Sequence, residues 1–146
     1  GQQFTFEIVI PSMYNIEIEK MIKTIKPLNQ RIVKTDFKVT ENGKKIYEAR
    51  CLACHQADGG GVPNMNAPLD AASNVVGTDI ARLVRIIRYG YNERIALDGF
   101  YYSNAMTASP DLKDNEIADL LTYIRNSWSN KASAITIAIT KFNSKY

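Results

Sequence analysis

The strongest pattern of apolar and polar positions lies near the C-terminal end of the chain. Between residues 114 and 127, apolar side chains recur every three or four positions, and this spacing predicts a helix with one buried face. The members of this apolar face are Ile117, Leu120, Leu121, Ile124 and Trp128. The following segment, 134–142, fits both a helix and a strand, because its β-branched residues also alternate.

Two earlier segments are also predicted to be helical. Residues 40–50 form the first, with Thr40 as its N-cap. The second covers residues 78–89, with Thr78 as N-cap and Gly90 at the position of a C-terminal stop. The second helix has an apolar face that must be buried. Its members are Ile80, Leu83, Val84 and Ile87.

The composition is that of one ordinary globular domain: the chain has 146 residues, of which 45% are hydrophobic and 23% charged. The formal net charge is only +3 and the two signs are interspersed, which excludes the strong basic field that nucleic-acid binding needs. No apolar run approaches the roughly 20 residues that cross a bilayer, so no transmembrane segment is expected. The N-terminus lacks the charged start and apolar centre of a signal peptide, which fits a mature or trimmed protein.

Residues 1–39 are predicted to form an N-terminal extension to a domain that covers residues 40–146. Within the extension, residues 4–10 alternate like a strand, and a short helix is predicted to end at Pro27. We interpret the extension as an interface element or as the end of a larger upstream domain.

The chemistry of the chain is concentrated in the five residues Cys51-Leu-Ala-Cys54-His55. They contain both cysteines and the single histidine of the chain, in the attachment pattern of c-type haem. Each thiol adds to one vinyl group of the haem to form a thioether, and the three-residue separation matches the spacing of the two vinyls. The imidazole of His55 then lies under the ring, where it can bind the iron. A loop rich in glycine and proline follows at residues 58–68 and is predicted to wrap the cofactor.

Three other interpretations of the cysteine pair are weaker. A dithiol redox centre is expected at the start of a helix in a βαβ unit, whereas this pair ends a helical segment. A structural zinc site needs four ligands, and the chain has no further cysteine or histidine to complete it. An incidental structural pair is the third and weakest alternative.

The second axial ligand of such an iron must come from elsewhere, and methionine, lysine, water or an open position are the candidates. Of the four methionines, Met13 and Met21 precede the haem-binding segment, and Met21 falls on an apolar helical face. Met65 follows the histidine closely, whereas Met106 lies in the loop before the last long predicted helix. Met106 is therefore the predicted ligand. A His/Met pair raises the reduction potential and leaves no open site, which favours electron transfer over catalysis.

Three arginines lie off the apolar face of the helix predicted at 78–89: Arg82, Arg85 and Arg88. The simplest interpretation is that they form its solvated side. The functional alternatives are a strip that docks a partner protein and a partner for the haem propionates. Both interpretations stay open at the level of the sequence.

These residues together resemble class I cytochrome c domains, in particular the bacterial domains that accompany quinoprotein or sugar dehydrogenases. The resemblance covers residues 40–142 and rests on several short phrases, at 43–47, 51–55, 60–63, 67–69, 104–106 and 116–128. It implies an all-α cytochrome c fold, with three to five helices wrapped around one covalently bound haem c.

The resemblance also implies roles for individual residues. The carbonyl group of Pro68 is expected to accept a hydrogen bond from the ring nitrogen of His55, which fixes the tautomer of the ligand. Tyr102 and Trp128 are expected to line the haem pocket. The first and third helices are expected to cross closely at Gly43, and the other residues at this crossing are Tyr47, Leu120 and Tyr123.

Two positions depart from the pattern of that family. Thr107 follows Met106 where a proline is usual, so the ligand loop is expected to be held differently. Lys113 stands where a serine or threonine usually caps the third helix, which leaves Asp114 as the expected cap.

The predicted function is the transfer of single electrons from a dehydrogenase, as a domain or a partner, to another cytochrome or a terminal oxidase. The chain is expected to be an electron carrier and not an enzyme. Because covalent haem attachment takes place after export, the predicted location is the periplasm or another exported compartment. Two rivals are a haem peroxidase-like or gas-sensing protein in which Met106 is displaced, and a haem-free zinc or dithiol module.

Overall fold

The structure is a computed structural model, and it describes residues 40–143. Helices and loops make up this part of the chain, in which isolated β-bridges occur but no strand. The prediction of an all-α fold is therefore confirmed for the described residues. The predicted strand at residues 4–10, the predicted helix before Pro27, and both Met13 and Met21 lie outside the described residues.

Helix α5 (Asp114–Arg125) contributes more residues to the hydrophobic core than any other helix, and four of the five members of its predicted apolar face are buried. The buried members of this face, each at most 5% exposed, are Ile117, Leu120, Leu121 and Ile124. The prediction that Asp114 is the cap is wrong. The N-cap is Lys113, whose backbone N–H donates to the carboxylate of Glu116 at 2.8 Å. Glu116, the third residue of the helix, thus gives the backbone N–H of the N-cap a hydrogen-bond acceptor.

The helix of residues 40–50 crosses α5 closely at Gly43. A Cβ atom at Gly43 would lie 2.2 Å from the carbonyl oxygen of Asp119 and 2.6 Å from Cβ of Tyr123. These distances leave no room for a side chain, so only glycine permits this approach. Next to the crossing, the ring of Tyr47 packs on the ring of Tyr123 with centroids 5.6 Å apart. The expected crossing is therefore confirmed.

Helix α4 (Ile80–Tyr89) starts from a different cap than predicted. The N-cap is Asp79 and not Thr78, because the Asp79 carboxylate accepts a hydrogen bond of 3.1 Å from the backbone N–H of Arg82. Gly90 ends the helix as predicted, with a positive φ of 78° that favours glycine.

The segment whose pattern was ambiguous forms helix α6 (Ile137–Asn143). This helix packs against α4 and α5. Thr140 is fully buried there, with its hydroxyl oxygen 2.9 Å from the carbonyl oxygen of Asp114. Since the local pattern favoured neither a helix nor a strand, the packing against two other helices decides the outcome.

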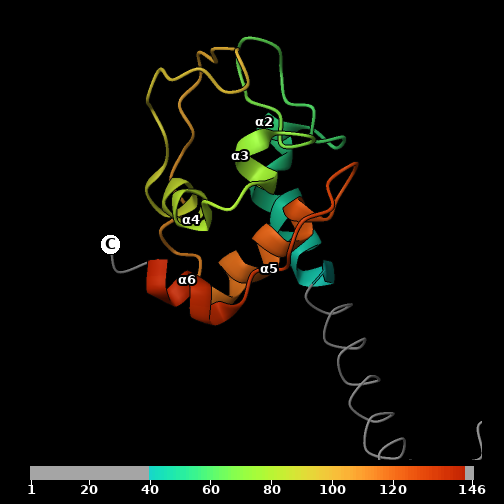
Figure 1. The fold of residues 1–146 in the computed structure, drawn as a ribbon, viewed down its shortest axis with the longest axis vertical. Helices are drawn as coiled ribbons and strands as arrows, with labels where there is room; N and C mark the ends of the chain where they lie inside the picture. The colour runs from blue at the N-terminus through green and yellow to red at the C-terminus, as the bar shows by residue number, and fades with distance from the viewer. Residues whose placement is uncertain (1–39, 144–146) are drawn as a thin grey trace, which may run out of the picture. The chain divides into compact units, whose positions relative to one another are not determined.

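Two single-turn helices complete the described part: α2 (Leu52–His55) and α3 (Ser73–Val76). With them, the described residues hold six helical segments where three to five were predicted, because such short turns carry no hydrophobic periodicity. Thr40 is itself helical, so the prediction that it is an N-cap is wrong. Long loops from α2 to α3 and from α4 to α5 lie on the same side of the helices (Figure 1). Among the described residues, no helix has the length and hydrophobicity that crossing a membrane requires.

Candidate functional site

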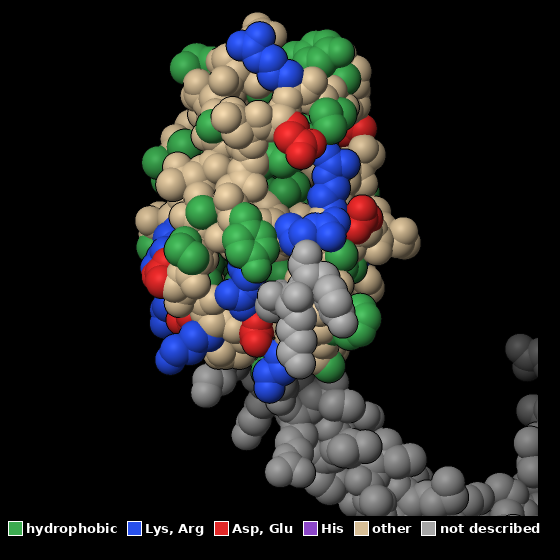
Figure 2. Space-filling model, turned by 90° about the vertical axis from the view of Figure 1, so that its left-hand side faces the viewer, with side chains coloured by type: hydrophobic (Ala, Val, Ile, Leu, Met, Phe, Trp, Pro, Cys, Tyr) green, Lys and Arg blue, Asp and Glu red, His purple; other side chains and the backbone are tan. Residues whose placement is uncertain are grey.

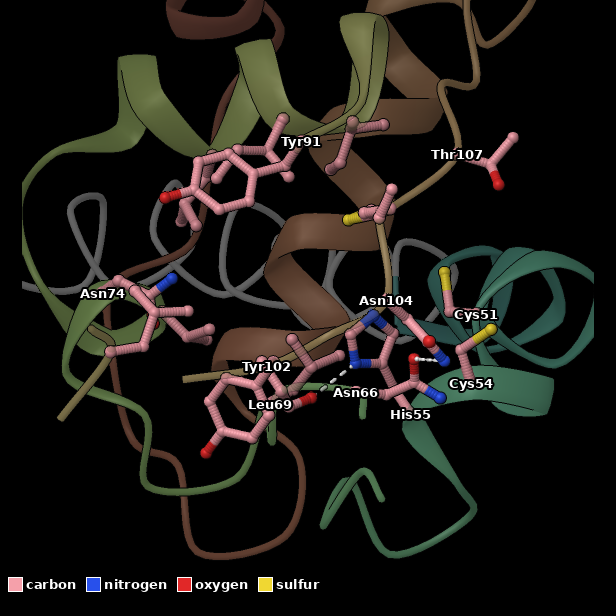
Figure 3. A pocket seen from close by; sticks show the side chains of 18 of the residues that line it. Cys51, Cys54, His55, Asn66, Leu69, Asn74, Tyr91, Tyr102, Asn104 and Thr107 are labelled. Carbon is pink, nitrogen blue, oxygen red and sulfur yellow. Dashed lines mark hydrogen bonds between the residues drawn. The ribbon is translucent and has the colours of Figure 1, made fainter. Parts of the chain in front are cut away.

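A pocket with a volume of about 280 Å³ lies between the cysteine segment, helix α4 and the loop that precedes α5 (Figure 3). Trp128 is the one predicted site residue that does not line it. The predicted site residues that do line the pocket are Cys51, Cys54, His55, Pro68, Tyr102 and Met106.

The two cysteines and His55 are presented by one helical segment. Two helical hydrogen bonds run through this segment. The backbone N–H of Cys51 donates to the Tyr47 carbonyl at 2.8 Å, and the backbone N–H of His55 donates to the Cys51 carbonyl at 2.9 Å. The two cysteines are not joined in a disulfide. Burial raises the pKa of the Cys51 thiol to about 11, whereas reactive dithiol centres depend on a lowered pKa. The environment of Cys51 therefore does not suit a dithiol redox centre.

The imidazole of His55 is held by the carbonyl oxygen of Ala67, which lies 2.8 Å from Nδ1. When Nδ1–H donates to this carbonyl, the lone pair of Nε2 is available to a metal. Burial lowers the pKa of His55, which favours the neutral ring that a metal requires. The predicted acceptor, the carbonyl of Pro68, is wrong by one residue. The accepting carbonyl belongs to the peptide group before the proline, and Pro68 itself lines the pocket.

Met106 is half-buried, and two hydrogen bonds fix its backbone against Tyr91. The Met106 N–H donates to the Tyr91 carbonyl at 2.8 Å, and the Tyr91 N–H donates to the Met106 carbonyl at 3.0 Å. Gly90 leaves room for this approach, since a Cβ atom there would lie 2.5 Å from the Met106 carbonyl oxygen. Met65 is 46% exposed and does not line the pocket. Of the methionines in the described residues, Met106 alone lines it.

A pair of asparagines joins the loop after the histidine to the loop before Met106. The side-chain amide of Asn104 donates to the side-chain oxygen of Asn66 at 3.0 Å, as drawn in Figure 3. The backbone N–H of Asn104 also donates to the Met65 carbonyl at 2.9 Å. These bonds tie down a loop in which Thr107 replaces the usual proline. The sequence carries no signal for this pairing, because the two asparagines are 38 residues apart.

Trp128 packs outside the pocket that the other predicted site residues line, so the structure lends no support to the expectation that it lines the haem pocket. Helix α5 has ended before this residue, and Trp128 has a positive φ of 56°, so it does not continue the apolar face. Its ring packs on Tyr47 and Tyr123, with centroid distances of 5.4 and 6.3 Å. Its indole N–H donates to the Ala57 carbonyl at 2.9 Å. Trp128 thus stabilises the segment that follows His55 through contacts outside the pocket.

Arg125 is a buried cation for which the sequence gives no signal, since a single arginine in a helix is ordinarily exposed. It is only 2% exposed. Its guanidinium donates to the carbonyls of Val75, Gly77 and Ser133 at 2.6, 2.8 and 3.0 Å. Burial lowers the pKa of Arg125. The side chain joins the end of α3 to the loop after α5.

The three arginines of α4 have different environments. Arg85 is exposed. Arg88 forms an ion pair with Asp114 and donates to the Leu112 carbonyl at 3.2 Å, so it has a structural role. Arg82 is half-buried and lines the pocket. On the face shown in Figure 2, basic side chains are interspersed with acidic and apolar ones, so no docking strip of a single charge crosses that face.

The groups around the pocket fit a covalently bound haem. One segment presents two thiols and an imidazole, and a thioether lines the same pocket from another loop. A zinc site would need further ligands, and the described residues contain no group of three His, Cys, Asp or Glu side chains placed for a metal ion. The rest of the wall is suited to a porphyrin ring, because it includes the apolar side chains of Leu83, Ile87, Leu121 and Ile124.

Two kinds of known protein are similar to this chain. Cytochrome c-552 of Thermus thermophilus is 34% identical over 92 residues, which are 61% of this chain and 70% of that protein. The cytochrome c subunit of the quinone alcohol dehydrogenase of Gluconacetobacter polyoxogenes is 34% identical over 104 residues, which are 66% of this chain but 20% of that subunit. The corresponding subunit of Gluconobacter oxydans is 29% identical over 98 residues, 62% of this chain and 19% of that subunit.

The family model for cytochrome c matches residues 40–128, which is more than half of the chain. The match includes the cysteine pair, His55 and Met106. Members of this family carry covalently bound haem c and transfer electrons, which agrees with the donor groups around the pocket. The chain therefore belongs to the cytochrome c family and is a class I c-type cytochrome with covalently bound haem c.

Proposed function

We propose that this cytochrome carries single electrons through a haem that Cys51 and Cys54 would attach and whose iron His55 and Met106 would ligate. One observation carries the proposal: His55, at the end of α2, and Met106, in the loop before α5, line the same pocket. Each is also held in place by the backbone, His55 by the Ala67 carbonyl and Met106 by its hydrogen bonds with another loop residue.

The bound haem supplies an iron that alternates between the ferrous and the ferric state. The protein supplies the ligands, and the thioether of Met106 is a soft, weak donor that raises the reduction potential relative to a second imidazole. It also supplies rigidity, because Ala67 holds the ring of His55 and Tyr91 holds the backbone of Met106. Because both His55 and Met106 are held in this way, they would keep their positions when the iron changes its charge, which favours electron transfer over substrate chemistry.

We propose a dehydrogenase as the electron donor, and another cytochrome or a terminal oxidase as the acceptor. Similarity to the cytochrome c subunits of quinone alcohol dehydrogenases supports the donor, although the matched segment is only about a fifth of those subunits. Since haem is attached after export, the proposed location is the periplasm or another exported compartment. Mixing the oxidised cytochrome with such a dehydrogenase and its alcohol should give alcohol-dependent reduction, and the absence of reduction would contradict this donor.

We also propose that residues 40–146 form the cytochrome domain and that residues 1–39 are an extension outside it. The family match begins at residue 40, which supports this boundary. A chain that begins at residue 40 should incorporate haem with the spectrum and potential of the full chain. Failure to incorporate haem would place part of the extension inside the cytochrome domain.

Replacement of Met106 tests the axial ligand. The haem-loaded variant Met106→Ala should lose the absorption band of the bond between sulfur and ferric iron, and its reduction potential should fall. Met65→Ala is the matched control, because it removes an exposed methionine outside the pocket and should change neither property. An unaltered spectrum in M106A would show that another group occupies the iron.

The rival function, a peroxidase-like or gas-sensing protein, requires Met106 to leave the iron. Carbon monoxide distinguishes the two functions, because it binds ferrous haem only at an open position. The reduced wild-type protein should bind carbon monoxide slowly, and M106A should bind it rapidly. Rapid binding by the wild type at low concentration would favour the rival.

A further inference from the structure

Arg82 is a cation in the pocket wall that has no anionic partner among residues 40–143. It is half-buried, and it forms no ion pair with any described residue. Its Nη2 donates a 3.3 Å hydrogen bond to the hydroxyl of Tyr91, and its Cζ lies 5.7 Å from the centre of the Tyr91 ring. The nearby carboxylate of Asp79 accepts a hydrogen bond from the backbone N–H of Arg82 and forms no ion pair with the guanidinium. Because a half-buried guanidinium has lost part of its hydration, binding an anion beside it is favourable.

Arg82 lies on the side of the pocket where the propionate edge of the haem is expected. Cys51 and Cys54 bind the vinyl edge, and the two propionates are carried on the side of the macrocycle away from the vinyls. In Figure 3 the cysteine sulfurs lie at one side of the pocket, and the polar ends of Tyr91 and Asn74 lie at the other side. Because Arg82 is bonded to the Tyr91 hydroxyl, it belongs to the side away from the cysteines.

We propose that Arg82, oriented by the hydroxyl of Tyr91, binds a propionate carboxylate of the haem and thereby raises the reduction potential. A guanidinium matches a carboxylate with two parallel hydrogen bonds. Asn74 lines the same side, and its side-chain amide makes no hydrogen bond within the described part of the chain, so it supplies a further donor. The inference rests on haem attachment at Cys51 and Cys54 and is independent of the second axial ligand.

The effect on the potential follows from charge. Oxidised haem carries one more positive charge than reduced haem, so a nearby carboxylate stabilises the oxidised form, and a cation paired with that carboxylate offsets the effect. The pocket wall beside Arg82 includes Leu83 and Ile87, which reduces screening by water. Arg85 is exposed on the same helix, and solvent and salt screen its charge. Removal of Arg82 should therefore lower the potential far more than removal of Arg85.

The test compares Arg82→Gln with Arg85→Gln in the haem-loaded full chain. Each variant removes one cation from α4, and only R82Q removes it from the pocket. The measurement is a redox difference infrared spectrum, in which isotopic labels in the propionate carboxyl groups identify the carboxylate bands. R82Q should shift these bands, and R85Q should leave them unchanged. The midpoint potential should fall in R82Q by several times the change in R85Q. Added salt should diminish only the change in R85Q.

Two further variants cover the case in which R82Q does not accumulate. Arg82→Lys keeps the charge but loses the two-pronged geometry, and Tyr91→Phe removes the hydroxyl that orients Arg82, so both should shift the carboxylate bands by a smaller amount. Unshifted bands in R82Q, or in both of these variants, would overturn the proposal. Equal shifts in R82Q and R85Q would also overturn it, as would a larger shift in Arg94→Gln, since Arg94 is exposed and also lines the pocket.

The outcome is separable from the fate of the proposed axial ligands. Loss of covalent haem would appear in the absorption spectrum before any propionate band is measured. An error in the choice of Met106 would appear in M106A and would leave the comparison of R82Q with R85Q unaffected.

Discussion

The side-chain amide of Asn104 donates a hydrogen bond of 3.0 Å to the side-chain oxygen of Asn66. Asn66 directly precedes Ala67, whose carbonyl holds the ring of His55, and Asn104 lies just ahead of Met106. One hydrogen bond therefore joins the supports of both proposed axial ligands. The pair therefore restrains the two loops relative to each other.

Replacing Asn104 by alanine should loosen Met106. A hydrogen bond makes a net contribution of about 0.5–1.5 kcal/mol, so dissociation of the sulfur from the iron should become about two- to twelvefold more favourable. The rate of carbon monoxide binding to the reduced protein measures this change. Ser103→Ala is the matched control, because the Ser103 hydroxyl makes only a long hydrogen bond of 3.5 Å, to the side-chain oxygen of Asn104, and none to the other loop. Equal rates in N104A and the wild type would show that the asparagine pair does not hold the ligand loop.

Gly90 and Gly99 provide a matched pair for testing the close approach to Met106. Both have positive φ, 78° and 87°. A Cβ atom at Gly90 would lie 2.5 Å from the Met106 carbonyl oxygen, whereas nothing lies within 4 Å of one at Gly99. Gly99→Ala should therefore cost about 1 kcal/mol of backbone strain, and Gly90→Ala about 2 kcal/mol more, because the neighbouring backbone must move.

Denaturant unfolding of the two haem-loaded glycine variants measures these free energies. The absorption band of the sulfur–iron bond should weaken in G90A and stay intact in G99A. If the two variants lost equal stability, the contact between Gly90 and Met106 would have no energetic importance.

Replacing Trp128 by phenylalanine should affect stability without affecting the haem. The change removes the hydrogen bond from the indole N–H to Ala57, so the free energy of unfolding should fall by about 1 kcal/mol. The haem spectrum and the potential should be unaltered, because Trp128 does not line the pocket. Tyr102→Ala is the contrasting variant, since Tyr102 does line the pocket and its loss should shift the potential. A shift of the potential in W128F would show that the indole acts on the haem although it does not line the pocket.

Replacing Arg125 by methionine should destabilise the protein strongly. The aliphatic part of the side chain is retained, but the carbonyls of Val75, Gly77 and Ser133 lose their donor. Leaving such buried acceptors unsatisfied should cost about 3 kcal/mol in the free energy of unfolding. Lys131→Met is the control, because it removes an exposed cation from the same loop and should be nearly neutral. A loss below about 1 kcal/mol in R125M would mean that water replaces the guanidinium.

The sequence alone determined the features of this protein that are local. The cysteine pair and His55 are adjacent in the chain, so the attachment chemistry can be recognised without any knowledge of the fold. The long helices follow from the spacing of apolar residues, which is also a local property, and the glycine at Gly90 marks the end of α4 correctly. The caps were less predictable. The start of each helix depends on which residue forms the capping hydrogen bond, and neighbouring residues, Thr78 beside Asp79 and Asp114 beside Lys113, could also have formed it.

Only the tertiary structure decided which distant groups meet. It places the Ala67 carbonyl and not that of Pro68 against the ring of His55, it puts Trp128 outside the pocket, and it buries Arg125. In each case the sequence names the atoms that can bond, but a hydrogen bond forms only when donor and acceptor come within about 3 Å. That distance depends on how separate loops pack against one another, and no local pattern of residues specifies it.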